Sequence, residues 1–184
     1  MSKARWIADY FRIKKAVANA AIKRLLKKDR LIRVAVEGWD DAGYVHPDNL
    51  KRIEAAAAGN IPQSKTTLLS PFDPLVRDRG RGITVFNFDY KIEFYFPASK
   101  RVYGYFSLPI LYNNALIGRL DPKAHRKEGI FEVKSLHLEP NIVVDDALVA
   151  ALKKTLRDCA MWHYTPQIVV RYASDAELAD LLSD

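Results

Sequence analysis

The prevailing spacing of the apolar residues changes near residue 60 of this 184-residue chain. Before that point most apolar residues recur every three to four positions, which is the period of one face of a helix. Beyond it, aromatic and β-branched residues alternate with polar ones, which is typical of strands. Asn60 to Lys65 lies between the two patterns and is predicted to be a linker. The change of period therefore predicts an α+β protein with two modules, residues 1–59 and residues 60–184.

The first module has the element order of a winged helix, which is a variant of the helix-turn-helix. Two helices followed by two strands are expected at Arg5–Phe11, Lys14–Arg30, Leu31–Val36 and Tyr44–His46. A turn-rich stretch at residues 37–43 would join the two strands. Asp48 is suited to cap a further helix, which would run to Ala58 and end at Gly59.

The second module is predicted to be an antiparallel, β-barrel-like domain followed by helices. Its clearest strand is Phe86–Phe96, because aromatic or apolar residues occupy every second position there. Tyr103–Tyr112 and Ala115–Leu120 are predicted to pair as a hairpin. The residues between them, Asn113-Asn114, suit a two-residue turn with positive φ.

The rest of the second module combines strand and helix signals. In Ile130–Leu138 the apolar phase shifts between Val133 and Leu136, which indicates a β-bulge. Asp145 or Asp146 can cap a long helix that ends near Trp162. A short strand is then expected at Gln167–Tyr172, and Ser174 with Glu177 has the spacing of a capping box that opens the last helix.

Positive charge is concentrated at the start of the chain. The net charge is +7 and the pI is near 9.4, and residues 1–33 hold 11 Lys and Arg against 2 Asp and Glu. Such a balance favours a polyanionic partner. Within the second predicted helix, one polar stripe falls every four residues and consists of Lys15, Asn19, Lys23 and Lys27. This stripe is either a recognition helix that contacts phosphates and bases or a solvated helix face.

A second basic cluster follows the linker, in a predicted loop that contains Arg77, Arg79 and Arg81. Guanidinium groups pair well with phosphate, and the glycines within the cluster would let the backbone approach a ligand closely. Asp73 and Asp78 could instead hold these arginines in internal ion pairs. Both interpretations stay open.

Two more polar segments could contact DNA. The Asn113-Asn114 tip is either an ordinary turn or a probe that enters a groove. Residues 121–127 are expected to form a polar loop, and its Lys123 and Arg126 are either solvated or part of an interface.

Several functional classes find no support in the sequence. No apolar run has the length of a membrane helix, which takes roughly 18 residues. The single cysteine, Cys159, fits the reducing cytoplasm and is expected to lie in the core rather than to act as a nucleophile. No metal site is expected, because the four histidines are scattered along the chain. No cofactor-binding fingerprint or nucleophile elbow is present. Asp73 and Asp78 are unsuited to act as a general acid, since neighbouring arginines would keep them ionised.

Several segments, taken in order, resemble the YcaQ/AlkZ family of DNA glycosylases. The most specific is residues 68–79, LLSPFDPLVRDR. It is followed by FDYKIE at residues 88–93 with Pro97, KRVYGY at 100–105, LPIL at 108–111, IGR at 117–119 and DPKAHR at 121–126. The resemblance covers about residues 30–139. It differs at Arg77, where an aromatic residue is common in the family.

The resemblance implies winged helices followed by a C-terminal β-barrel. It also implies hydrolysis of N-glycosidic bonds of alkylated or crosslinked purine nucleotides in duplex DNA, without a metal or another cofactor. The family's catalytic motif, Gln-x-Gln, Gln-x-Asp or His-x-Gln, is absent, because Gln63 and Gln167 lie in other contexts. The chain also starts at what would be the second helix of a winged helix. A DNA-binding C-terminal fragment without catalytic residues is therefore expected, with the N-terminal half of the same protein as a further partner.

The residues predicted to contact DNA are Lys15, Asn19, Lys23, Lys27, Arg77, Arg79, Arg81, Asn113, Asn114, Arg119, Lys123 and Arg126. We expect the cations of the first helices and of the arginine cluster to converge on one surface. Two alternatives remain open. One is a winged-helix transcription regulator or ligand-sensing DNA-binding module, and the other is a structural or protein-interaction domain.

Overall fold

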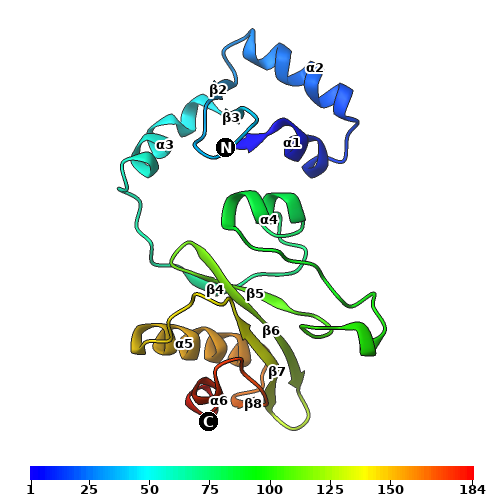
Figure 1. The fold of residues 1–184 in the computed structure, drawn as a ribbon, viewed down its shortest axis with the longest axis vertical. Coiled ribbons are helices and arrows are strands. Elements are labelled where there is room, and N and C mark those ends of the chain that lie inside the picture. Colours follow the sequence, from blue (N-terminus) through cyan, green and yellow to red (C-terminus); the bar gives the residue numbers. More distant parts are fainter. The chain divides into compact units, whose positions relative to one another are not determined.

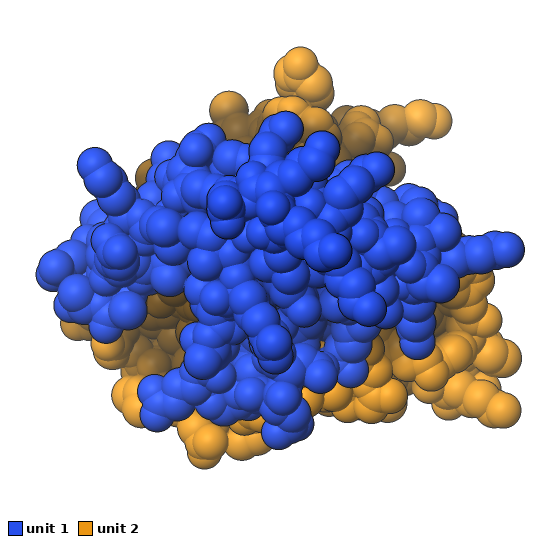
Figure 2. Space-filling view, turned by 90° about the horizontal axis from the view of Figure 1, so that it is seen from above, with its two compact units in different colours: residues 1–62 blue, residues 63–184 orange.

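The computed structural model describes all residues from Met1 to Asp184. The chain divides into two compact units, unit 1 at Met1–Pro62 and unit 2 at Gln63–Asp184 (Figures 1 and 2). Together they form a mixed α+β fold with six α-helices. None of these helices combines the length and the apolar character needed to cross a membrane.

Unit 1 consists of helices and a small antiparallel sheet of three strands, and these helices and strands are interspersed along the chain. Its elements are β1 (Ser2–Lys3), α1 (Ala4–Tyr10), α2 (Lys15–Leu26), β2 (Ile32–Val34), β3 (Gly43–Val45), the 3-10 helix η1 (Pro47–Asn49) and α3 (Leu50–Ala57). The helices and strands predicted in residues 5–58 are present; α2, β2 and α3 are shorter than predicted, and α1 and β3 begin one residue earlier. Strand β1 was not predicted, and it pairs with β3 on the side opposite β2. Asp48 does not cap α3 as predicted, because it lies inside η1, where its N–H donates to His46 Nδ1.

A pair of tryptophans organises the core of unit 1. Trp6 of α1 is 2% exposed and meets Trp39 edge to face, with ring centroids 4.9 Å apart. The Lys3 ammonium is also buried and lies 5.5 Å and 5.0 Å from the Trp6 and Trp39 ring centroids. Cation–π attraction therefore offsets part of the cost of burying this charge.

Unit 2 is built on a curled five-stranded sheet that forms a half-barrel (Figure 1). Its elements are β4 (Thr66–Leu68), α4 (Arg79–Phe86), the 3-10 helix η2 (Ala98–Lys100), β5 (Leu108–Tyr112), β6 (Ala115–His125), β7 (Ile130–Leu138), α5 (Asp146–Trp162), β8 (Gln167–Val170) and α6 (Ala176–Leu182). The strand order is β4-β5-β6-β7-β8. The pairs are antiparallel except β7–β8, which is parallel because α5 carries the chain between them. The sequence had predicted an antiparallel sheet. The parallel β7–β8 pair departs from that prediction.

Both faces of this sheet are covered. On one face the larger core packs α5 and α6 against β5–β8, and α5 contributes a stripe at every fourth residue, Leu148, Leu152, Leu156 and Ala160. A smaller core joins Leu116 of β6 to residues outside the strands, namely Leu69, Val76, Phe88 and Tyr90. Neighbouring residues of β6, Leu116 and Ile117, belong to different cores. Strand β6 is consequently buried along most of its length.

The predicted strand at Phe86–Phe96 is wrong. Phe86 ends α4, Asn87 lies in the left-handed region with φ 50°, and none of the residues from Asn87 to Phe96 belongs to a strand. The alternation nevertheless has a cause, since Phe88 and Tyr90 are buried in the smaller core while Asp89 between them is exposed. An alternating pattern reports which side chains are buried, and it does not show that the backbone has a hydrogen-bonding partner.

Two buried carboxylates stabilise the long segment between α4 and β5. Glu93 accepts hydrogen bonds from the N–H groups of Val102 and Tyr103, both at 2.8 Å. Asp121 of β6 accepts from Tyr105 and Phe106 at 2.8 Å and 3.0 Å. Side-chain oxygens thus satisfy backbone donors that a neighbouring strand would otherwise satisfy. The predicted strand beginning at Tyr103 therefore begins only at Leu108.

The other local predictions for unit 2 compare as follows. The β5–β6 hairpin is confirmed, and its turn residues Asn113 and Asn114 have φ of 46° and 67°. The bulge is confirmed too, because Asp121 pairs with Ser135 while Pro122 pairs with Val133. Helix α5 begins after the cap Asp145, as predicted. The last helix is present, but its cap is Asp175 rather than Ser174.

The predicted loop at residues 121–127 is mostly strand. Strand β6 continues through His125 and pairs with β7 up to Ile130. Proline at position 122 is tolerated in the strand because it lies at the bulge, where the ladder is already interrupted.

Candidate nucleic-acid interface

A basic pocket opens on unit 1, between its two first helices and its sheet. Its volume is about 340 Å³, and it is lined by Ala4, Arg5, Lys15, Asn19, Arg33, Asp41, Ala42 and Tyr44. We call this the basic pocket. Two of the residues predicted to contact DNA, Lys15 and Asn19, therefore lie in one concave site.

Local structure explains why these side chains meet. Lys15 and Asn19 are four residues apart on α2 and so share one side of the helix. Arg33 lies between two half-buried residues of β2, Ile32 and Val34, and its side chain points to the solvent-facing side of the strand. Arg33 pairs directly with Tyr44 of β3, which places both on the same face of the sheet.

The charge in the basic pocket is unbalanced. Arg5, Lys15 and Arg33 are three cations, and Asp41 is the only carboxylate in the lining. All three cations are exposed, and none is in an ion pair within 4.0 Å. The amide of Asn19 and the phenol of Tyr44 add uncharged hydrogen-bonding groups. A phosphate group is the kind of ligand that such a set of donors suits.

The remaining residues of the predicted stripe lie beyond the pocket. Lys23 is exposed in the last turn of α2, and Lys27 is the residue that caps its C-terminal end. Basic side chains at this end are favourable to the helix dipole. The stripe thus continues along α2 as exposed positive charge, although only its first half lines the pocket.

The arginine cluster of unit 2 is not the loop that the sequence predicted. Arg79 and Arg81 belong to α4, whose cap Asp78 accepts a hydrogen bond from Arg81 N at 3.0 Å. The Arg81 guanidinium donates to Pro74 O at 2.6 Å. Asp73 accepts from Leu75 N at 2.8 Å and therefore caps a turn. Arg77 is half-buried.

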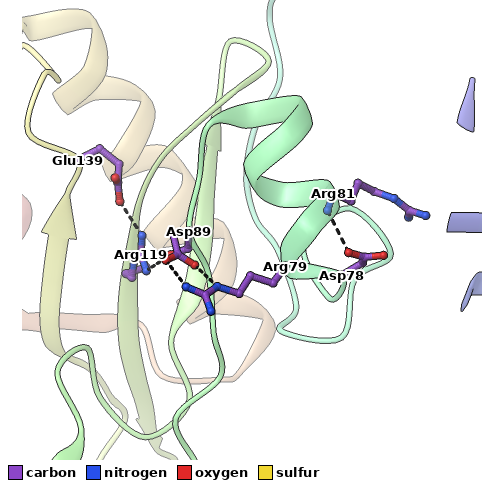
Figure 3. Close-up of polar contacts among 6 residues, drawn as sticks. All are labelled: Asp78, Arg79, Arg81, Asp89, Arg119 and Glu139. Carbon is purple, nitrogen blue, oxygen red and sulfur yellow. Dashed lines mark hydrogen bonds and ion pairs between the residues drawn. The ribbon is translucent and has the colours of Figure 1, made fainter. Parts of the chain in front are cut away.

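Arg79 forms an ion pair with a residue that the sequence analysis had not considered (Figure 3). Its Nε and Nη2 donate to the two carboxylate oxygens of Asp89 at 2.5 Å and 2.6 Å. These hydrogen bonds lower the pKa of Asp89 below its ordinary value. Arg79 is therefore in an internal ion pair, as one of the two interpretations of the sequence had it. Its partner is Asp89 instead of Asp73 or Asp78.

Arg119 was predicted to contact DNA, and its burial contradicts this. The side chain is 3% exposed and donates to Glu139 Oε1 at 2.6 Å and to the Asp89 carbonyl at 3.0 Å (Figure 3). Its guanidinium also lies 4.3 Å and 4.2 Å from the ring centroids of Phe88 and Tyr103. Arg119 is a structural residue, because its hydrogen-bond acceptors and the two rings that it contacts all belong to unit 2.

A second, smaller cavity lies over Arg119. It measures about 240 Å³ and is lined by Arg79, Asp89, Lys91, Glu93, Tyr103, Arg119 and Glu139. Three cations face three carboxylates in this lining, in contrast to the basic pocket. Since its charges are balanced and largely paired, this cavity does not select an anion.

The remaining residues that were predicted to contact DNA are exposed. Asn113 and Asn114 form the tip of the β5–β6 hairpin. Lys123 is exposed on β6. Arg126 follows the end of β6 and hydrogen-bonds to His163 Nδ1 at 3.0 Å.

Other chemistry has little basis in this chain. No group of three or more His, Cys, Asp or Glu side chains is arranged so that it could hold a metal ion. Cys159 packs against the larger core of unit 2, and burial raises the pKa of its thiol above the ordinary value. The reactive thiolate is therefore disfavoured.

Comparison with known proteins identifies the class. A sequence model described as "DNA glycosylase AlkZ-like" matches residues 2–162. The chain belongs to the AlkZ-like DNA glycosylase family. Its fold is similar to the solved structure of Streptomyces sahachiroi DNA glycosylase AlkZ, with a TM-score of 0.52 and 17% sequence identity. That match covers 86% of this chain and 37% of the other, so the chain spans well under half the length of that glycosylase.

Sequence reasoning missed the other residues of the basic pocket. Arg5, Arg33 and Tyr44 come from a helix and two strands that are separated in sequence. The alternation of Arg33 with Ile32 and Val34 was the available signal, because it marks an outward-facing cation on a strand. Nothing local in the sequence connects that position to Lys15.

Proposed function

We propose that this chain is the DNA-binding part of an AlkZ-like glycosylase, in which residues 1–59 form a winged-helix module and residues 60–184 a barrel-like domain. The substrates in view are duplexes with alkylated or crosslinked purine nucleotides, which places the protein in DNA repair. Membership of the family supports a role on DNA. The single observation that carries the proposal is the basic pocket, with three unpaired cations at one site.

In this proposal the basic pocket holds a phosphate of the DNA backbone. Arg5, Lys15 and Arg33 neutralise its charge, and Asn19 and Tyr44 orient it. The exposed Lys23 and Lys27 extend the contact along the strand. Contacts to phosphates fix the position of a protein on DNA and carry no sequence information themselves. We therefore expect similar affinity for unrelated duplex sequences, which a sequence-specific regulator would not show.

The hairpin tip is a further element of the proposal. Asn113 and Asn114 carry polar side chains at the exposed end of β5 and β6, and such a tip can enter a DNA groove. No residue of this chain is proposed to be catalytic, because the Gln-x-Gln, Gln-x-Asp or His-x-Gln motif is missing from it. We expect these 184 residues to bind DNA without excising a base. The single cysteine is consistent with work in the reducing cytoplasm.

The test uses two variants with equal loss of charge. The double variant Lys15→Gln/Arg33→Gln removes two cations of the basic pocket, and Lys51→Gln/Arg52→Gln removes two exposed cations of α3. Fluorescence anisotropy with a labelled duplex is measured over a range of salt concentrations. The pocket variant should bind about tenfold more weakly, and the magnitude of its slope of log K against log salt should fall by about 0.9, which is the value for the one phosphate that the pocket holds.

The control variant decides how the result is understood. It should keep the wild-type salt slope, because α3 lies outside the pocket lining. Equal losses in both variants would show that only the total charge matters. Unchanged binding by the pocket variant would refute the proposed phosphate site.

A further inference from the structure

Two large aromatic side chains near the end of α5 are exposed, two positions apart in the chain. Trp162 is the last residue of the helix and is 76% exposed, and Tyr164 follows two positions later at 83% exposed. Large apolar side chains rarely stay in water without a role when they occur in a cluster. The turn between β6 and β7 lies beside them, since Gln167 N donates to Gly129 O at 3.1 Å. We call Trp162, Tyr164, Arg126 and Lys127 the aromatic patch.

The aromatic patch rests on a rigid base. The ring of His163 lies between Trp162, at a centroid distance of 4.6 Å, and the buried Phe131, at 6.0 Å. The backbone of the turn is hydrogen-bonded to α5, with Tyr164 N donating to Met161 O at 3.0 Å. Tyr164 is also held at φ 59°, which is uncommon for an aromatic residue. The Trp162 ring is thus held by its contact with His163, which lowers the entropic cost of stacking a ligand on it.

The cations of the patch are suited to phosphate. Arg126 donates from Nη2 to His163 Nδ1 at 3.0 Å, and its other guanidinium nitrogens have no hydrogen-bonding partner in the chain. Burial first and the charge of Arg126 second lower the pKa of His163 below its ordinary value, which favours the neutral ring. Lys127 is exposed beside Arg126. One guanidinium held by His163 and the ammonium of the next residue in the chain, Lys127, therefore belong to the turn beside the aromatic segment.

We propose that the aromatic patch binds unpaired nucleotides of a single-stranded nucleic acid. Bases would stack on Trp162 and Tyr164, and the phosphates between them would contact Arg126 and Lys127. Every base has a flat face, so such a surface binds many sequences. A duplex hides these faces, and the patch is therefore selective for unpaired strands.

The combination of groups favours this occupant over a protein surface. Protein interfaces are also enriched in Trp, Tyr and Arg but are depleted of lysine at their centre, so Lys127 is the group that favours a nucleic acid. Exposed aromatic rings beside basic groups are the arrangement that binds single-stranded nucleic acids. The inference is independent of duplex binding by the basic pocket, which belongs to unit 1.

The experiment compares two oligonucleotides of equal charge, a labelled oligothymidylate and an abasic strand of the same length. Both are titrated with the full chain, and binding is followed by fluorescence anisotropy. The wild type should bind the thymidylate strand about tenfold more tightly than the abasic strand, because only the former can stack. Trp162→Ala and Tyr164→Ala should each bring this ratio close to one, whereas Trp162→Phe should keep most of it.

Two controls separate stacking from charge and from misfolding. Tyr95→Ala removes another exposed tyrosine of unit 2, 75% exposed, and should leave the ratio unchanged. Arg126→Gln should weaken the binding of both oligonucleotides equally, because it removes a phosphate contact. Circular dichroism confirms that each variant is folded, which is expected since the substituted side chains are exposed.

Three results would overturn the inference. The first is an unchanged ratio in Trp162→Ala. The second is a wild type that binds both strands equally, which would mean that the patch recognises charge alone. The third is a chain that dimerises in sedimentation experiments and becomes monomeric on Trp162→Ala, which would identify the patch as a protein interface. Loss of duplex binding in the basic-pocket variant affects none of these outcomes, so the two proposals fail separately.

Discussion

Unit 1 and unit 2 use arginine in opposite ways. In unit 1, Arg5 and Arg33 are exposed, form no ion pair and face a pocket with only one carboxylate. In unit 2, Arg79 is bound to both oxygens of Asp89, and Arg119 is buried between two aromatic rings. A positive residue in a sequence is therefore not the same as positive charge on a surface. The tertiary neighbours of the residue decide between the two.

The reason lies in what each unit needs for stability. Unit 2 contains a long segment between α4 and β5 with no strand partner, and buried polar groups satisfy its backbone. The guanidinium of Arg119 reaches the Asp89 carbonyl at the start of that segment. Unit 1 has short connections and satisfies its backbone largely within helices and a small sheet. The three cations of its basic pocket are left available for a ligand.

The largest expected effect comes from removing the buried arginine. Arg119→Ala should lower the free energy of unfolding by about 3 kcal/mol, because Glu139 and the Asp89 carbonyl lose their donor and two rings lose a packing partner. Arg33→Ala in unit 1 should leave stability unchanged and weaken duplex binding. Urea unfolding measures the stability of the two variants, and titration with a DNA duplex measures their binding. The contrast between the units fails if both variants unfold at the same urea concentration.

A glycine in each unit gives the next effect. Gly104 has φ +116°, and a Cβ added there would collide with the Asp121 carboxylate that caps Tyr105 and Phe106. Gly104→Ala should therefore destabilise the protein by about 2–3 kcal/mol. Gly38 of unit 1 has φ +73° and open space around it, so Gly38→Ala should cost only about 1 kcal/mol of backbone strain. Equal costs in thermal unfolding would mean that Asp121 is not the reason for the glycine.

A smaller effect is expected from acid. Hydrogen bonds from His125 first and Arg171 second lower the pKa of Glu132 below its ordinary value of 4.5. Because the folded state binds this proton more weakly than the unfolded state, the stabilisation is complete above pH 4.5 and is lost as the pH falls through the lowered pKa. The difference between the urea midpoints measured at about pH 6 and at about pH 3 should be smaller in Glu132→Gln than in the wild type. If the variant loses as much stability between these two pH values as the wild type does, Glu132 is not the group responsible.

The smallest effect concerns the exposed ion pair of unit 2. Arg79→Gln should leave the urea midpoint unchanged, because exposed ion pairs contribute little to stability. It should also keep duplex affinity within about twofold of the wild type, since its guanidinium is already occupied by Asp89. Arg33→Gln is the matched comparison and should weaken binding more. A loss in Arg79→Gln as large as in Arg33→Gln would show that this arginine leaves Asp89 to contact DNA.

Much of the local structure could be predicted from the sequence. The apolar stripe of α5, the Asn113-Asn114 turn and the bulge in β7 were all visible as patterns over a few residues. The strand prediction at Phe86–Phe96 failed although its pattern was the strongest. Its aromatic residues cover a face of the sheet, and neither edge strand pairs with them. The candidate site was found in part, through Lys15 and Asn19, while Arg5, Arg33 and Tyr44 were missed.

The sequence by itself determined the helices, the hairpin and the excess of positive charge at the start of the chain, because period, turn preference and composition are local properties. The tertiary structure decided which cations are available. The acceptors of Arg119 lie 30 and 20 residues away from it in the chain, and the basic pocket draws its lining from two helices and two strands. Electrostatic pairing depends on distance in space, and folding sets that distance for residues that the sequence keeps apart.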